Sequence, residues 1–272
     1  MYKRYTAGKD FSKTIEIVQN FNKNNVQCSI SYLPIKKNDV SGVYHEVLEY
    51  YKLIDKIKQN KLDADVTLKV HQFGVYANQE LCTKAITDIV KYAHNNNTFV
   101  WIDMEMKDTV DYTINLFQNI HKKYKNTGIA LQAYLKRTEE DMKELLKNKV
   151  PIRLVKGFYS TGDFNKWSDV TKNYEHLMKY LLLHSKRPCI ATHDLALIAK
   201  AKEIIKKHKL KHAELQMFKG VRDELAVQNA LEGFNARVYV PYGHVYKFLF
   251  FGLPTFDLIH AIKRILGFKT IT

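Results

Sequence analysis

The stretch GIALQAYLKRTEEDMKELLKNKVPIRLVK, residues 128–156, decides the fold. It begins with a short apolar segment at 128–134, continues with helical periodicity over 138–148, and ends in a second short apolar segment at 151–156. Two short strands joined by a helix form the unit from which parallel sheets are built, because parallel neighbours need a crossover connection. The stretch therefore predicts one β–α–β unit.

The same alternation of short apolar strands and amphipathic helices extends along the chain. Strands are predicted at 26–32, 64–70, 98–104, 128–134, 151–156, 188–192, 213–217 and 236–240. Helices are predicted at 14–24, 43–58, 80–94, 109–124, 138–148, 170–184, 195–207 and 223–233. Eight such units predict an α/β fold, a closed (β/α)₈ TIM barrel. The competing fold is a doubly wound sheet, which normally has a Gly-rich turn after its first strand, and residues 31–34 (SYLP) contain none.

Composition bounds the class of protein. The chain has 272 residues, of which 46% are hydrophobic and 26% charged, and no linker rich in Pro, Gly or Ser divides it, so we predict a single domain. The net charge is +15, but the lysines are scattered along the predicted helix faces, and no nucleic-acid-binding motif accompanies them. We therefore expect a solvated lysine-rich surface and no nucleic-acid partner.

Cysteine usage and the N-terminal sequence indicate a compartment. The three cysteines, Cys28, Cys82 and Cys189, lack the spacing of a zinc site or a disulfide framework, which fits a reducing environment. Met1 to Arg4 are not followed by the apolar segment of a signal peptide, and no window is long enough to cross a bilayer. We expect a cytoplasmic protein.

Polar residues gather where the predicted strands end. In a barrel of this class the active site lies at the carboxyl ends of the strands, so these side chains should form one constellation. They are Lys69, His71, Gln72, Asp103, Glu105, Gln132, Tyr134, Arg153, Lys156, Tyr159, Thr192, His193, Asp194, Gln216, Tyr239 and Tyr242. Such a ring is hard to explain by packing and predicts a binding site.

Individual members of this ring have more than one interpretation. Lys69 and Asp103 end neighbouring strands and form either a structural ion pair or a pair that orients a substrate. His193 is either a core histidine or a donor to a phosphate or ribityl group, and the tyrosines are either packing residues or pocket walls. Asp103 and Glu105 resemble paired glycosidase carboxylates, but nothing else indicates a sugar site.

Five ordered motifs resemble the signature motifs of the proline dehydrogenase family. They are DME at 103–105, LQAYL at 131–135, RLVKGFY at 153–159, ATHD at 191–194 and YVPYG at 239–243. RYTAG at 4–8 adds to the resemblance, which covers nearly the whole chain. The resemblance implies an FAD-dependent barrel that oxidises L-proline to 1-pyrroline-5-carboxylate, with a hydride passing to flavin N5 and the electrons passing on to a quinone.

The resemblance also implies roles for particular residues. Arg153 is similar to the arginine near flavin N5, and Gln132 to the glutamine that reaches the flavin ring. The further FAD contacts that it implies are Met104, Lys156, Gly157, Phe158, Thr192 and His193. The residues similar to those of the substrate pocket are Lys69, Asp103, Tyr159 and Tyr239. A cation beside N5 stabilises the reduced, anionic flavin, which agrees with the cationic strand end at Arg153.

The C-terminal segment, residues 244–272, departs from the family's pattern. The family has an Arg-Arg pair there that binds the proline carboxylate, whereas ungapped alignment places Gly252 and Leu253 at those positions. Three explanations stay open: Lys263 and Arg264 replace the pair from a shifted helix, the substrate is a different cyclic amine, or the protein is a scaffold or partner subunit without proline turnover. Phe158 also stands where the family has a small residue.

The same segment contains an apolar run. Residues 248–253 (FLFFGL) form either core packing of the last helix or a peripheral membrane contact, where a quinone would be met.

Overall fold

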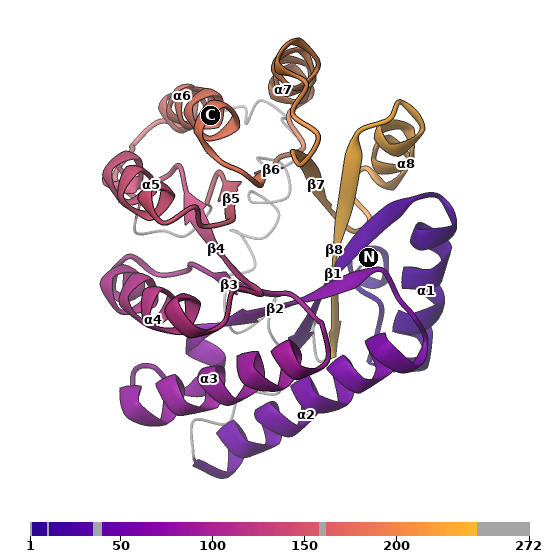
Figure 1. Ribbon diagram of the computed structural model, residues 1–272, viewed down its shortest axis with the longest axis vertical. Coiled ribbons are helices and arrows are strands. Elements are labelled where there is room, and N and C mark those ends of the chain that lie inside the picture. The colour runs from indigo at the N-terminus through magenta and orange to yellow at the C-terminus, as the bar shows by residue number, and fades with distance from the viewer. Residues whose placement is uncertain (1, 10, 35–39, 158–161, 244–272) are drawn as a thin grey trace.

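A closed barrel of eight parallel strands forms the centre of the molecule (Figure 1). The computed structural model describes residues 2–9, 11–34, 40–157 and 162–243. The strands are β1 (Val26–Leu33), β2 (Ala64–Lys69), β3 (Val100–Asp103), β4 (Thr127–Gln132), β5 (Ile152–Val155), β6 (Pro188–Ala191), β7 (Glu214–Phe218) and β8 (Asn235–Gly243). They pair in chain order, and β1 pairs with β8 over its whole length to close the barrel.

Helices surround the barrel (Figure 1). They are α1 (Phe11–Lys23), α2 (Val40–Gln59), α3 (Gln79–Asn95), α4 (Val110–Lys123), α5 (Thr138–Lys147), α6 (Trp167–His184), α7 (Leu195–His208) and α8 (Asp223–Leu231). Short 3₁₀ helices lie at Tyr2–Tyr5, Val70–Phe73 and Lys107–Thr109. Since α1 precedes β1 and contacts both β1 and β8, it covers the seam where the barrel closes.

The predicted barrel is confirmed, with differences confined to element ends. Strand β3 begins at Val100 and not at residue 98, because Thr98 is still hydrogen-bonded to the end of α3. Strand β8 extends to Gly243 and not to residue 240, because its ladder with β1 continues as far as the Leu33–Gly243 pair. Tertiary pairing therefore sets the strand ends that local sequence leaves undefined.

The barrel interior is unusually polar. Strands of a parallel barrel alternate between side chains that face the helices and side chains that face the axis. The apolar set, such as Val66 and Leu68 on β2, packs in the buried core, while the intervening Asp65, Thr67 and Lys69 join a hydrogen-bonded network with residues of other strands. The core thus lies between sheet and helices, and the axis is left for ionic groups.

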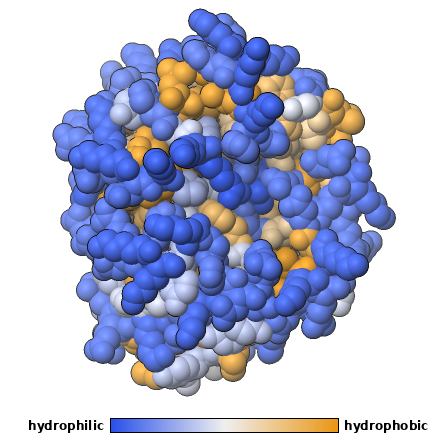
Figure 2. Space-filling view, in the orientation of Figure 1, coloured by the Kyte–Doolittle hydropathy of each residue, from blue (hydrophilic) through white to orange (hydrophobic). Residues whose placement is uncertain are grey.

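The outer surface is mostly hydrophilic on the face that Figure 2 shows, with apolar side chains in isolated groups. This agrees with lysines distributed along the helices. Among the helices that the structure describes, none combines the length and the apolarity needed to cross a membrane.

Candidate active site

Three charged side chains meet at the carboxyl end of the barrel, and we call them the upper triad: Lys69, Asp103 and Arg153. The register pairs Lys69 directly with Asp103 on the neighbouring strand. Lys69 Nζ lies 2.9 Å from Asp103 Oδ2, and Arg153 Nη1 lies 3.1 Å from Asp103 Oδ1. Each carboxylate oxygen thus receives one cation, and the triad has two positive charges for one negative charge.

Tyr239 forms a wall beside the upper triad. Its ring centroid lies 5.8 Å from Lys69 Nζ and 5.9 Å from the Arg153 guanidinium carbon. Phe218 stacks on the same ring with centroids 5.4 Å apart, and burial raises the pKa of Tyr239. The phenol therefore stays neutral and presents a π face to the two cations.

Gln132 and Gly157 bring the ends of β3, β4 and β5 together. The Gln132 amide donates to the carbonyl oxygens of Met104, at 3.2 Å, and Glu105, at 2.6 Å. Gly157 has a φ of +84°, and a Cβ there would lie 2.6 Å from Gln132 Oε1 and 2.9 Å from Tyr134 Cβ. The sequence needs glycine at this position both for its backbone conformation and for the close approach.

Lys156 lies next to Gly157 and is held by the start of α7. Its Nζ lies 3.0 Å from Asp194 Oδ2 and 3.1 Å from Thr171 Oγ1. Asp194 also caps α7 by accepting from the backbone N–H groups of residues 196 and 197. Burial raises the pKa of Asp194, but Lys156 and these caps outweigh it and lower the pKa. The carboxylate therefore fixes the Lys156 ammonium at the strand end.

His193 is held as a neutral donor. Its Nε2 accepts from the backbone N–H of Phe218 at 2.8 Å, which leaves the ring proton on Nδ1. Burial and the nearby Arg222 lower the pKa of His193 to about 4. Thr192 precedes it at the end of β6, buried, with its hydroxyl accepting from Asp194 N–H at 3.2 Å.

The structure thus divides the predicted residues into two groups. Lys69, Asp103, Arg153 and Tyr239 lie together on β2, β3, β5 and β8. The ends of β3 to β6 bring the predicted FAD contacts Met104, Gln132, Lys156, Gly157, Thr192 and His193 to the same end of the barrel. Phe158, Tyr159 and the predictions for Gly252, Leu253, Lys263, Arg264 and the run 248–253 lie outside the described residues.

The second group fits a flavin nucleotide by its chemistry. A buried glycine with left-handed backbone gives a close backbone approach, Lys156 supplies a fixed cation, and His193 supplies a neutral N–H donor. Cations and N–H donors beside a glycine turn are what a phosphate-bearing cofactor requires.

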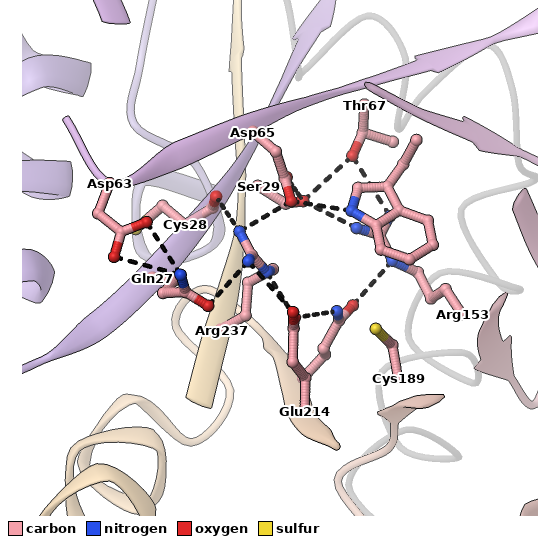
Figure 3. Close-up of polar contacts among 12 residues, drawn as sticks. Gln27, Cys28, Ser29, Asp63, Asp65, Thr67, Arg153, Cys189, Glu214 and Arg237 are labelled. Atoms are coloured by element: carbon pink, nitrogen blue, oxygen red, sulfur yellow. Dashed lines mark hydrogen bonds and ion pairs between the residues drawn. The ribbon is translucent and has the colours of Figure 1, made fainter. Parts of the chain in front are cut away.

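An ionic cluster at the amino ends of the strands, with three buried members and the partly exposed Arg187, was not predicted. We call it the barrel floor: Asp65, Arg187, Glu214 and Arg237. Arg237 bridges the two carboxylates, with Nη1 2.8 Å from Asp65 Oδ2 and Nε 2.7 Å from Glu214 Oε2 (Figure 3). Arg187 Nη2 lies 2.8 Å from Glu214 Oε1. Its two cations and two anions balance. The two-residue periodicity of strands could have predicted it, because side chains an even number of residues apart face the same side of a strand. Asp65 precedes Lys69 by four residues and Arg237 precedes Tyr239 by two, so both should face the barrel axis.

The sequence is similar to known proteins over most of its length. A family model described as proline dehydrogenase matches residues 14–251. Proline dehydrogenase 2 of Bacillus subtilis (strain 168) is 32% identical over 242 residues, which are 87% of this chain and 80% of the relative. The proline dehydrogenase of Deinococcus radiodurans is 28% identical over 250 residues, 88% of this chain and 81% of the relative.

Solved structures share the fold. Proline utilization A (PutA) from Bdellovibrio bacteriovorus, inactivated by N-propargylglycine, superposes with a TM-score of 0.84 at 19% identity. PutA from Corynebacterium freiburgense superposes with a TM-score of 0.75 at 18% identity. The match covers 99% and 96% of this chain but 33% and 32% of those chains, so this chain spans about a third of their length.

Proposed function

Because the chain belongs to the proline dehydrogenase family, we propose that it binds FAD and oxidises L-proline to 1-pyrroline-5-carboxylate. The observation that carries this proposal is the upper triad, whose excess positive charge lies beside the residues suited to a flavin. The chemistry that FAD supplies when bound is two-electron oxidation by hydride acceptance at N5, with a quinone as the onward acceptor.

The described residues have separate tasks in this proposal. Lys69 binds the substrate carboxylate with a charge-assisted hydrogen bond. Asp103 holds Lys69 and Arg153 at a fixed separation, since each of its oxygens faces one of them. Tyr239 packs beside both cations, which keeps water away and strengthens their fields.

The cofactor side of the site is formed by other residues. Lys156 and His193 contact the FAD, and Gly157 allows the backbone to approach it. Arg153 pairs with Asp103 at the end of β3, directly before the proposed FAD contact Met104, and would stabilise negative charge that develops on the reduced cofactor. Thr192 and the backbone at Met104 complete the proposed FAD contacts.

Anaerobic absorbance spectroscopy tests the function. Purified protein should show a flavin spectrum, and L-proline should bleach it in the absence of oxygen. Hydroxyproline and pipecolate serve as comparison substrates. A flavin spectrum that none of the three bleaches would contradict proline oxidation, and a protein without flavin would contradict FAD binding as well.

Two lysines should separate substrate binding from cofactor binding. Replacing Lys69 by methionine removes one charge-assisted hydrogen bond, so KM for proline should rise roughly 10- to 30-fold while FAD content stays unchanged. The matched control, Lys156→Met, should lower FAD content instead. Steady-state kinetics measure KM, and the flavin-to-protein absorbance ratio measures FAD content. Equal loss of FAD in both variants would contradict the assignment of Lys69 to the substrate and Lys156 to the cofactor.

One feature of the sequence supports a second candidate function. The absence of the family's Arg pair at Gly252 and Leu253 leaves Lys69 as the cation assigned to the carboxylate. A cyclic amine that depends less on a carboxylate, or a flavin-binding subunit without proline turnover, would tolerate that change. Preferential bleaching by such an amine would favour the first, and no bleaching by any amine would favour the second.

A further inference from the structure

Arg153, a member of the upper triad, is held mainly by buried side chains from other strands. Its side chain is 3% exposed. Nε donates to Gln216 Oε1 at 2.8 Å, Nη2 donates to Ser29 Oγ at 2.7 Å, and Nη1 donates to Thr67 Oγ1 at 3.3 Å besides contacting Asp103. Three strands other than its own and that of Asp103 thus fix the plane of the guanidinium.

Two of these partners, Gln216 and Ser29, connect Arg153 to the barrel floor, and Figure 3 shows the connection through Ser29. Gln216 accepts from Arg153 through Oε1 and donates through Nε2 to Glu214 Oε2 at 2.9 Å. Ser29 accepts from Arg153 and donates through the same hydroxyl to Asp65 Oδ1. Because a guanidinium can only donate, Gln216 must turn its oxygen to Arg153 and its NH₂ group to Glu214. The Ser29 hydroxyl likewise accepts from Arg153, so its own proton is available for the hydrogen bond to Asp65.

Arg237 and Trp101 lock this arrangement from below. Arg237 bridges Asp65 and Glu214, so both connections end on one cation. The indole N–H of Trp101 donates to Asp65 at 2.8 Å, and its ring centroid lies 4.5 Å from the Arg153 guanidinium carbon. Gly128 makes room for this indole, since a Cβ there would lie 2.4 Å from the ring.

We propose that Gln216 and Ser29 are positioning residues that orient Arg153 from the barrel floor and so set the reduction potential of the bound flavin. The effect on the flavin rests on the proposed function, whereas the orientation of Arg153 does not. A guanidinium held in one plane costs no reorganisation when negative charge develops beside it. Without its lower acceptors, Arg153 would turn away and stabilise the reduced cofactor less.

The first experiment needs no cofactor. In ¹⁵N-edited NMR spectra, the Arg153 Nε–H should exchange slowly with solvent, with the signal assigned by its loss in Arg153→Lys. Gln216→Met should abolish the slow exchange, because methionine offers no carbonyl acceptor. The matched control is Gln27→Met: Gln27 accepts from Arg237 at 2.8 Å on the far side of the floor and does not contact Arg153 in the described contacts.

The second experiment measures the flavin midpoint potential. Gln216→Met and Ser29→Ala should each shift the reduced-to-oxidised equilibrium at least tenfold towards the oxidised flavin, about 30 mV for a two-electron couple. Gln27→Met should leave it unchanged. If Gln216→Met does not fold, Ser29→Ala decides, because it removes one hydroxyl only.

The outcomes distinguish this inference from the proposed function. The positioning role would be overturned if the Arg153 Nε–H still exchanged slowly and the flavin midpoint potential were unchanged in both Gln216→Met and Ser29→Ala. A protein that binds no flavin but loses the Arg153 signal in Gln216→Met would overturn the proposed function and the effect on potential, while supporting the orientation of Arg153 by Gln216.

Discussion

Replacing Arg237 by methionine is expected to lower the free energy of unfolding by about 3–5 kcal/mol. The Arg237 side chain is 4% exposed and bridges Asp65 and Glu214 inside the barrel. It also donates to the Cys28 carbonyl at 2.9 Å. Methionine fills much of the volume but leaves two buried carboxylates without this cation, and that uncompensated burial dominates the cost. Urea-induced unfolding followed by circular dichroism measures it.

Arg187→Met is the matched control. Arg187 contacts the same Glu214 carboxylate, but its side chain is 28% exposed, and among the described ion pairs it is Arg237 and not Arg187 that contacts Asp65. Its replacement should therefore cost less, about 1–2 kcal/mol. Equal costs for the two variants would show that the bridge between Asp65 and Glu214 has no special role.

The effect of Arg237→Met should depend on pH. Burial raises the pKa of Glu214, but Arg237 and Arg187 outweigh it and hold the pKa at about 2, below the ordinary 4.5. A lowered folded-state pKa contributes stability that is present above pH 4.5 and is lost as pH falls through 2. The difference between wild type and variant should thus be largest near neutral pH and narrow as pH falls below 4.5.

The barrel could be predicted because its signal is local. Each strand is a short apolar run and each helix is amphipathic, so segments such as β6, expected at 188–192 and found at Pro188–Ala191, are visible without their neighbours. Ends governed by pairing, such as the extension of β8 to Gly243, depend on the partner strand β1 and could not be located from the sequence.

Site residues could be predicted only at the carboxyl ends of the strands, where the active site of such a barrel lies. Strand ends gave Lys69, Asp103 and Arg153, and the structure joins these three. The floor residue Arg237 lies inside a predicted strand, and nothing local shows that it meets Asp65, far away in the sequence. Barrel closure and register decide that contact.

Gly157→Ala should reduce FAD affinity roughly a hundredfold, because a strained backbone of about 1 kcal/mol and overpacking of about 1–3 kcal/mol act together. The glycine has a φ of +84°, and an added Cβ would lie 2.6 Å from Gln132 Oε1. Gln132 is not free to move, since its amide already donates to Met104 and Glu105 at the end of β3. The clash would therefore displace the ends of β3 and β5, where we place the flavin. Titration of apoprotein with FAD, followed by flavin fluorescence, measures the affinity.

Gly233→Ala separates the two causes. Gly233 has the same φ of +84°, but a Cβ there meets nothing within 4 Å, and it lies just beyond α8. This variant carries the backbone strain without the clash, so it should lose about 1 kcal/mol of stability and keep its FAD affinity. If Gly157→Ala bound FAD as tightly as Gly233→Ala, the close approach of Gly157 to Gln132 would have no part in the cofactor site. A hundredfold difference between two alanines with the same backbone angle would instead place the cofactor against the ends of β3 and β5.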